Sequence, residues 1–222
     1  MCKFTEKALP LHRETQNTMK KALTILSAMM LAVLLTAGCG SLGNISNSLG
    51  NLGLGGHTFT FNSLPQNLDD LQALPEASLT DPYAVAALTV AALTRYGTSS
   101  RDCIQMLNYL KGPEPVSGYE SQFIRERLQG KEYKPFSFFK GATPANNYTP
   151  SRPYKITVDS NPYSFTTDSS GHEWCTLYVT SGGADSPRPI KLRKKGSTGQ
   201  WFLNDIQCLS DIRTPAGEDK WY

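Results

Sequence analysis

The sequence predicts an α+β domain in which helices come first and an antiparallel sheet of four or more strands follows. Capping residues and apolar periodicity indicate about three helices, at residues 82–96, 100–111 and 118–129. Four apolar, strand-like segments come next, at residues 154–159, 174–180, 189–195 and 201–209. The connections between these segments are polar and glycine-rich, which favours an antiparallel meander with the helices packed on one face.

Caps define where the three helices begin. Asp81 is a good N-cap and Pro82 a good first residue for the first helix, whose Ala, Val and Leu side chains cover almost every face. A helix that is apolar all round is normally buried, so this segment is predicted to be the core helix. Ser99 and Ser117 are each followed three residues later by an acidic residue, as in a capping box. The predicted C-terminal stop of the first helix is Gly97.

Three further segments complete the expected fold. Residues 57–61 alternate between apolar and polar side chains and are predicted to form a first strand, and residues 67–74 a short helical turn. Residues 131–153 contain four prolines and no regular period, so they are predicted to be a long irregular segment. By analogy alone, this order of elements fits a helix-plus-curved-sheet fold such as the nuclear-transport-factor-2-like group.

Residues 19–40 have the pattern of an export signal. Lys20 and Lys21 precede an apolar run over residues 22–35, which is short for a membrane span, and small residues lead directly to Cys39. Residues 34–39, Leu-Leu-Thr-Ala-Gly-Cys, resemble the bacterial lipobox. The resemblance implies that the Cys39 thiol is acylated and that cleavage before it makes Cys39 the N-terminus. The alternatives are an ordinary secretory signal with a chance cysteine, or a buried core helix.

The signal divides the chain into segments and predicts its location. We expect an over-extended start at residues 1–18 and a signal peptide at residues 19–38. A lipidated cysteine with a flexible Gly/Asn/Ser-rich tether follows at residues 39–56, and a single α+β domain at residues 57–222. The domain is therefore predicted to be extracytoplasmic and held at a membrane by its N-terminal lipid. That membrane is the outer membrane in a bacterium with two membranes, and otherwise the plasma membrane, at its outer face.

Removing the signal changes the charge balance. The whole chain has 22 Lys and Arg against 19 Asp and Glu, but residues 1–38 hold five of the basic and two of the acidic residues, which leaves 17 of each. A formally neutral chain has no excess charge to drive general binding to nucleic acid, so no nucleic-acid partner is expected. The mature chain has two histidines and no His or Cys pair at ligand spacing, so neither a metal site nor a cofactor is predicted.

Three cysteines follow Cys39 in the sequence. Cys175 and Cys208 lie in strand-like segments, and an exported compartment permits a disulfide between them. Cys103 lies on the apolar face of the second helix and is predicted to be a buried thiol. The sequence does not fix the connectivity, so the Cys175–Cys208 disulfide is one possibility among several.

Residues from Leu79 to the C-terminus resemble an uncharacterised domain family of exported bacterial proteins. Three segments carry the resemblance, at residues 79–88, 141–150 and 181–194. It covers about two-thirds of the chain. The resemblance implies one genuine domain and implies no activity.

The sharpest catalytic hypothesis pairs Cys103 with His172, in the manner of papain-like peptidases and amidases of the cell wall. His172 precedes a strand-like segment, and the chemistry requires it to take the thiol proton, with Asn204 or Asp205 orienting its ring. Asp102, next to the cysteine, disfavours the thiolate. The alternative is a buried cysteine and a loop histidine, and an enzyme is the less favoured reading.

Two segments are candidates for binding. The irregular segment contains five aromatic side chains: Tyr133, Phe136, Phe138, Phe139 and Tyr148. They form either a platform for sugars or Pro-rich peptide, or an anchor that packs the segment onto the sheet. On strand alternation, Lys191, Arg193 and Lys195 share one face while Ile190 and Leu192 turn to the core with Lys194. The basic residues are either a docking surface for anionic lipid, wall polymer or an acidic partner, or lysines that protect an edge strand.

These observations predict a cell-envelope lipoprotein that binds a ligand or protein partner without catalysing a reaction. The expected binding surface is the aromatic segment together with the basic strand, and the expected partners are the membrane, an envelope protein or a cell-wall polymer. Two alternatives remain at this point. One is the wall peptidase or amidase, and the other is an envelope structural or assembly protein, which predicts a self-associating apolar patch.

Overall fold

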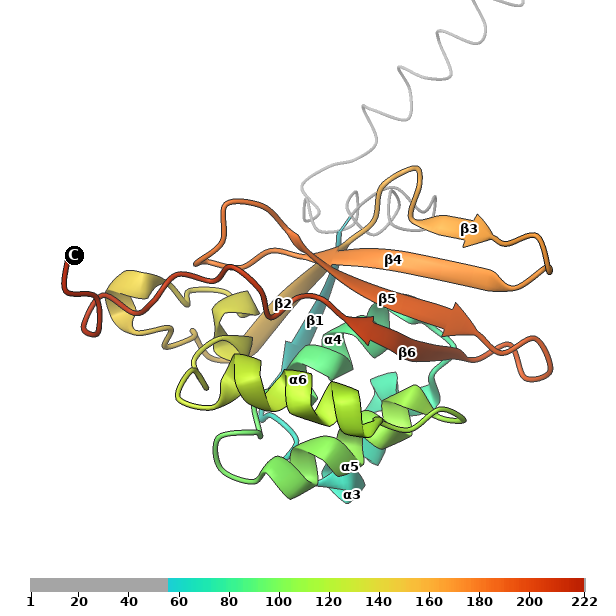
Figure 1. The fold of residues 1–222 in the computed structure, drawn as a ribbon, viewed down its shortest axis with the longest axis horizontal. Coiled ribbons are helices and arrows are strands. Elements are labelled where there is room, and N and C mark those ends of the chain that lie inside the picture. The colour runs from blue at the N-terminus through green and yellow to red at the C-terminus, as the bar shows by residue number, and fades with distance from the viewer. Residues whose placement is uncertain (1–55, 222) are drawn as a thin grey trace, which may run out of the picture. The chain divides into compact units, whose positions relative to one another are not determined.

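The computed structural model of the chain describes residues 56–221. The predicted start, signal peptide and lipidated Cys39, and the tether up to residue 55, lie outside the described residues. Within them, helices precede most of an antiparallel sheet, so the predicted α+β class is confirmed (Figure 1). No helix in residues 56–221 is both long and apolar enough to cross a bilayer.

The described residues contain four α-helices, three short 3-10 helices and six strands. The helices are α3 (Leu68–Gln72), η1 (Pro75–Ser78), α4 (Pro82–Leu93), α5 (Ser100–Lys111), α6 (Gly118–Leu128), η2 (Pro135–Phe138) and η3 (Pro144–Asn146). The strands are β1 (His57–Phe61), β2 (Tyr154–Asp159), β3 (Phe165–Thr167), β4 (Glu173–Val179), β5 (Arg188–Lys194) and β6 (Trp201–Ile206). All three long helices and all five long strands correspond to predicted segments, whereas β3 was not predicted.

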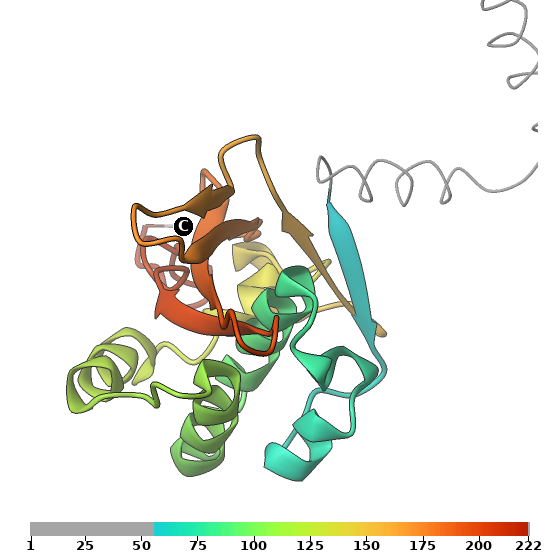
Figure 2. The ribbon, with the colours of Figure 1, turned by 90° about the vertical axis from the view of Figure 1, so that its right-hand side faces the viewer.

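Antiparallel pairing orders the sheet β1-β2-β4-β5-β6, with the short β3 paired to β4. The sheet is curved and wraps around α4, while α3, α5 and α6 lie on the open side of the curve (Figure 2). β5 is hydrogen-bonded on both sides, by β4 and by β6. The interpretation of its basic residues as protection for an edge strand is therefore wrong.

Helix α4 is the centre of the core. It packs against all five long strands, and its residues from Tyr83 to Leu93 are all buried. Its start is set as predicted, because the Asp81 side chain accepts a hydrogen bond from the Tyr83 amide at 2.9 Å. The buried hydrophobic residues among residues 56–221 all fall between Phe61 and Ile212, so this core lies within the predicted domain of residues 57–222.

The first helix ends earlier than the sequence predicts. α4 stops at Leu93 instead of continuing toward Gly97. The amides of Arg95 and Tyr96 bond to carbonyls three residues back, at Ala92 and Leu93, and this tightens the last turn out of α-helical geometry. The resulting turn points the Arg95 side chain toward the segment that follows β1, which matters for the site described below.

Candidate functional site

The aromatic side chains of the irregular segment are mostly part of the core. Phe138, Phe139 and Tyr148 are only 2–3% exposed. Tyr148 stacks on Tyr133 with ring centroids 5.1 Å apart, and its hydroxyl donates to the Arg213 carbonyl at 2.7 Å. Burial raises the pKa of Tyr148 to about 12. The predicted surface platform is therefore wrong for these three rings, which anchor a long loop that would otherwise bury little apolar area.

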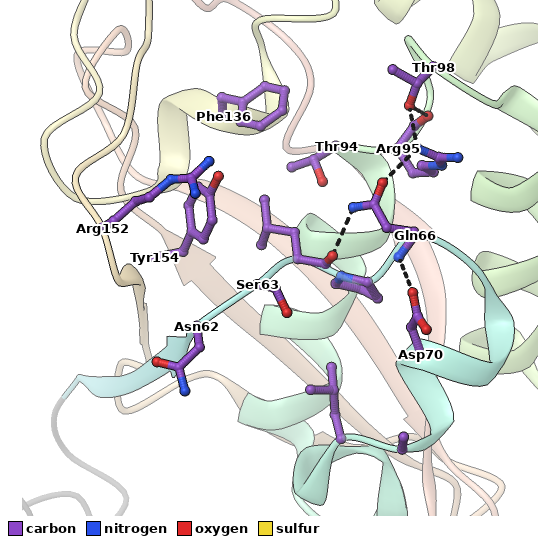
Figure 3. Close-up of a pocket in the computed structure, with 14 residues that line it drawn as sticks. Asn62, Ser63, Gln66, Asp70, Thr94, Arg95, Thr98, Phe136, Arg152 and Tyr154 are labelled. Atoms are coloured by element: carbon purple, nitrogen blue, oxygen red, sulfur yellow. Dashed lines mark hydrogen bonds between the residues drawn. The ribbon is translucent and has the colours of Figure 1, made fainter.

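One member of this aromatic set, Phe136 on η2, lines a cleft of about 570 Å³ (Figure 3). Four other parts of the fold complete the cleft: the segment that follows β1, the end of α3, the turn after α4, and the start of β2. A cavity of this size is in the range that accepts a small ligand. Its lining residues are Asn62, Ser63, Leu64, Pro65, Gln66, Asp70, Ala73, Leu74, Thr94, Arg95, Thr98, Phe136, Arg152 and Tyr154.

One wall of the cleft combines aromatic rings with a cation. Phe136, Arg152 and Tyr154 lie together on the same side of the close-up view (Figure 3). The Arg152 guanidinium carbon lies 5.3 Å from the centre of the Tyr154 ring, so the cation is held over an aromatic face. Within residues 56–221, Arg152 has no acidic partner. This wall can therefore stack against a flat apolar surface and pair with a negative group.

The other wall is a polar network whose members already bond to one another. Arg95 Nη1 donates to Gln66 Oε1 at 2.6 Å and to Thr98 Oγ1 at 3.0 Å. The backbone amide of Gln66 donates to Asp70 Oδ2 at 2.9 Å. These bonds hold the wall in a fixed shape. Arg95 Nε is buried and has no hydrogen-bond partner among the described residues, which leaves an unsatisfied donor beside the cleft.

The predicted pair of Cys103 and His172 does not come together. Cys103 is fully buried near the start of α5, and burial raises the pKa of its thiol to about 12. His172 lies near Lys111, because both residues line one pocket at the far end of that helix. Lys111 follows Cys103 by eight residues on α5, about 12 Å at the usual helical rise. A fully buried thiol with a raised pKa stays protonated near neutral pH and is a poor nucleophile.

His172 instead belongs to the turn between β3 and β4. Its ring Nδ1 lies 3.1 Å from Asp168 Oδ2, and its amide donates to Asp168 Oδ1 at 3.0 Å. Trp174 Nε1 also donates to this carboxylate, at 2.9 Å. Hydrogen bonds from Trp174 and from His172 together lower the pKa of Asp168. The histidine is thus held by a turn-forming aspartate.

The disulfide considered between Cys175 and Cys208 is absent. Cys103, Cys175 and Cys208 are all free and buried. Cys175 lies on β4 and Cys208 follows β6, with β5 between the two strands. Strands separated by one neighbour are about 10 Å apart, whereas a disulfide needs Cα atoms within about 7 Å. The topology of the sheet therefore keeps the two thiols apart.

The basic strand lies away from the cleft. Lys191 is exposed and Arg193 half-buried on β5, Lys195 follows the strand, and Ile190 and Leu192 face the core as predicted. The cleft is built at the β1–β2 side of the sheet and β5 is next to the opposite edge. The expected single surface made of aromatic segment plus basic strand is thus divided between two places.

Clusters of metal ligands and exposed apolar side chains would mark two other kinds of site. In the part of the chain that the structure describes, no group of three or more His, Cys, Asp or Glu side chains gathers as a metal site would. The large exposed apolar side chains are Tyr119 on α6, Tyr163 and Phe165 near β3, and Trp221 at the C-terminal end. They come from three separate parts of the sequence, and an apolar patch for self-association would have to combine them.

The aromatic pattern of the sequence points to Phe136 and Tyr154 but not to the polar side of the cleft. Arg152 and Tyr154 carry a weak signal, since an arginine and an aromatic ring flank Pro153 at the start of a predicted strand. Gln66, Asp70 and Arg95 carry none, because they come from segments far apart in the sequence. Only the turn after α4 and the path of the chain after β1 bring them together.

Comparisons with known proteins identify a family but no activity. A family model described as a domain of unknown function (DUF6935) matches residues 63–216, which is more than half of the chain. No curated protein matches the chain. No solved structure matches it either, so the likeness to the nuclear-transport-factor-2-like group stays a prediction.

Proposed function

The chain belongs to the DUF6935 family of domains of unknown function, and from that premise we propose that it is a cell-envelope lipoprotein whose domain binds a ligand without transforming it. The observation that carries the proposal is the cleft of about 570 Å³, which has an aromatic wall, a cation and a fixed polar wall. The burial of the Cys103 thiol, which raises its pKa, and the contact of the His172 ring with Asp168 support this proposal over the competing peptidase.

The ligand we propose is a sugar unit of a cell-wall polymer that carries a carboxylate. A sugar ring has an apolar C–H face, which suits the rings of Phe136 and Tyr154, and hydroxyls that suit a polar wall. The unpaired Arg152 guanidinium is placed to bind the carboxylate. Asn62 and Ser63 lie at the edge of the cleft with side-chain groups that bond to no other described residue, so they are available to the ligand.

The envelope location rests on the signal that ends at Cys39. We expect Cys39→Ser to abolish incorporation of a labelled fatty acid and to move the protein out of the membrane fraction, because the acyl chains supply the anchor. Metabolic labelling followed by fractionation measures both effects. A protein that stays at the membrane after Cys39→Ser, and that was never labelled, would show that the signal is not a lipobox.

Binding in the cleft is tested with the domain of residues 57–222 and soluble fragments of cell-wall glycan. We expect Arg152→Gln to weaken binding about five- to tenfold, which corresponds to the loss of one charge-assisted hydrogen bond or ion pair. Ser63→Trp should abolish binding by filling the cleft from its exposed rim. Isothermal titration calorimetry measures both variants.

The matched control is Arg101→Gln, which removes the same charge from an exposed position on α5 outside the cleft. It should bind as the unmodified domain does. Equal weakening by Arg101→Gln and Arg152→Gln would mean that binding is non-specific. Full binding by Ser63→Trp, with an unchanged melting temperature, would place the ligand elsewhere.

A further inference from the structure

A row of aromatic and cationic side chains crosses the solvent side of the sheet, away from the cleft. The strand register places Trp174 opposite Arg193, and Arg193 opposite Phe202, on β4, β5 and β6 in turn. Two cations lie against the indole ring: Lys191 Nζ is 4.9 Å from its centre and Arg193 Cζ is 5.0 Å. The Trp174 ring therefore holds two positive groups side by side.

These cations are poorly neutralised by the rest of the domain. Lys191 and Lys195 form no ion pair with any described residue. Arg193 Nη1 lies 3.9 Å from Glu114 Oε1, but the Glu114 side chain is 72% exposed, and such surface pairs are weak. Asp205 is opposite Lys191 in the register, yet its carboxylate accepts a hydrogen bond from Gln207 at 2.6 Å instead.

The row continues into a small pocket of about 290 Å³. Its lining includes four basic side chains, the carboxylate of Glu114, and apolar side chains that include Pro113 and Phe202; the basic ones are Lys111, Arg193, Lys194 and Lys195, and His172 lies beside them. A bulge in β6 leaves Asn204 without a partner on β5, and its carbonyl accepts a hydrogen bond from Lys111 Nζ at 3.2 Å. This bond ties the end of α5 to the strand edge and fixes one side of the pocket.

We propose that this surface, formed by Lys191, Arg193, Lys195 and Trp174 and called here the cationic row, binds a polyanionic chain such as an acidic envelope polymer. Alternate residues of a strand are about 7 Å apart, so the three cations repeat at a spacing that suits closely spaced negative groups along a polymer. The pocket at the end of the row receives one unit of that chain. This inference rests on the row alone and does not depend on what the cleft binds.

The geometry favours a polymer over a lipid bilayer. Membrane-docking aromatic residues protrude so that the ring reaches the interface, whereas Trp174 is half-buried and lies beneath two cations. A concave pocket at the end of the row also suits a chain better than a flat surface. Residues 39–222 carry equal numbers of basic and acidic residues, so their net charge does not attract a polyanion. The attraction has to come from the local concentration of cations in the row.

The test is a titration of the domain of residues 57–222 with short-chain polyphosphate, followed by tryptophan fluorescence. We expect binding to change the emission of Trp174, and Trp174→Phe to remove most of that change although Trp201 and Trp221 remain. Lys191→Gln and Arg193→Gln should each weaken binding about five- to tenfold. Each should also reduce the slope of log affinity against log salt by about 0.7, the loss of one charge contact.

Lys155→Gln is the matched control, because Lys155 is an exposed lysine on β2 of the same sheet, outside the row. It should stay within twofold of the unmodified domain. The proposal is overturned if the domain binds neither polyphosphate nor polyglutamate. It is also overturned if Lys155→Gln weakens binding as much as Lys191→Gln and Arg193→Gln do. Binding to vesicles rich in anionic lipid without binding to either polymer would overturn it in favour of a membrane surface. Preference between the two polymers assigns phosphate or carboxylate groups to the ligand.

Discussion

Gly182→Ala is expected to lower the free energy of unfolding by about 3 to 4 kcal/mol, at or above the usual range for overpacking. A Cβ atom at this position would lie 1.9 Å from the carbonyl oxygen of Ala142. That oxygen belongs to the backbone and cannot rotate away. The Gly182 amide also donates to the Ser137 carbonyl at 2.8 Å, so moving the turn to relieve the clash breaks a bond that joins it to the irregular segment.

Urea denaturation followed by circular dichroism measures this effect, with Gly196→Ala as the matched control. Gly196 lies in the turn at the other end of β5, and a Cβ there meets nothing within 4 Å. Its replacement should change stability by no more than about 0.5 kcal/mol. If the two variants unfold at the same urea concentration, the close packing of the Gly182 turn on Ala142 is not present in solution.

Glu120→Gln is expected to cost about 2 kcal/mol, because it leaves a buried ammonium without its counter-charge. Lys111 is only 6% exposed, and its Nζ lies 2.6 Å from Glu120 Oε1. The figure is below the 3 to 5 kcal/mol of a fully buried pair because the Glu120 side chain is 35% exposed and solvent screens part of the interaction. Glutamine can keep the capping-box bond to the Ser117 amide through its one oxygen, but its NH2 group then faces Lys111, so the substitution removes both the charge and the acceptor from the ammonium.

The same pair predicts how stability responds to acid. Partial burial alone would raise the pKa of Glu120, but hydrogen bonds from Lys111 and Ser117 outweigh it and lower that pKa. A carboxyl with a lowered pKa stabilises the fold fully above its usual pKa of about 4.3, and this contribution is lost as the pH falls through the lower folded value. The gap between the unmodified domain and Glu120→Gln should therefore narrow below about pH 4.

A double variant separates the ion pair from other effects of the substitution. Lys111→Met combined with Glu120→Gln replaces the buried ammonium by an apolar side chain of similar length, and should recover most of the lost stability. Thermal melts between neutral pH and pH 3 measure the series. A constant gap at all pH values, or a double variant no more stable than Glu120→Gln, would contradict the role given to the pair.

The helices and most strands were predictable because their signals are local. Asp81, Ser99 and Ser117 cap their helices as the sequence indicates, and each side chain accepts a bond from an amide two or three residues on. Strand β3 was missed because it is only three residues long, and all three are exposed, so it shows no apolar alternation. The end of α4 was missed because bonds within the last turn, not Gly97, terminate it.

The candidate sites depend on long-range packing and were much less predictable. Whether Tyr148 lies on the surface or in the core is decided by Tyr133 and by the carbonyl of Arg213, far along the chain. Whether β5 is an edge strand is decided by its pairing with β6. Side-chain alternation on β5 was predicted because it follows from strand geometry alone, and Ile190 and Leu192 are fully buried.

The three free thiols mean that the folded domain does not rest on a disulfide among its described cysteines. Cys103, Cys175 and Cys208 are all buried, so no oxidant is needed to complete the fold. Compact packing around α4 has to supply the stability that crosslinks provide in many exported domains. The domain of residues 57–222 is thus expected to reach the same structure in a reducing cytosol as in an oxidising envelope.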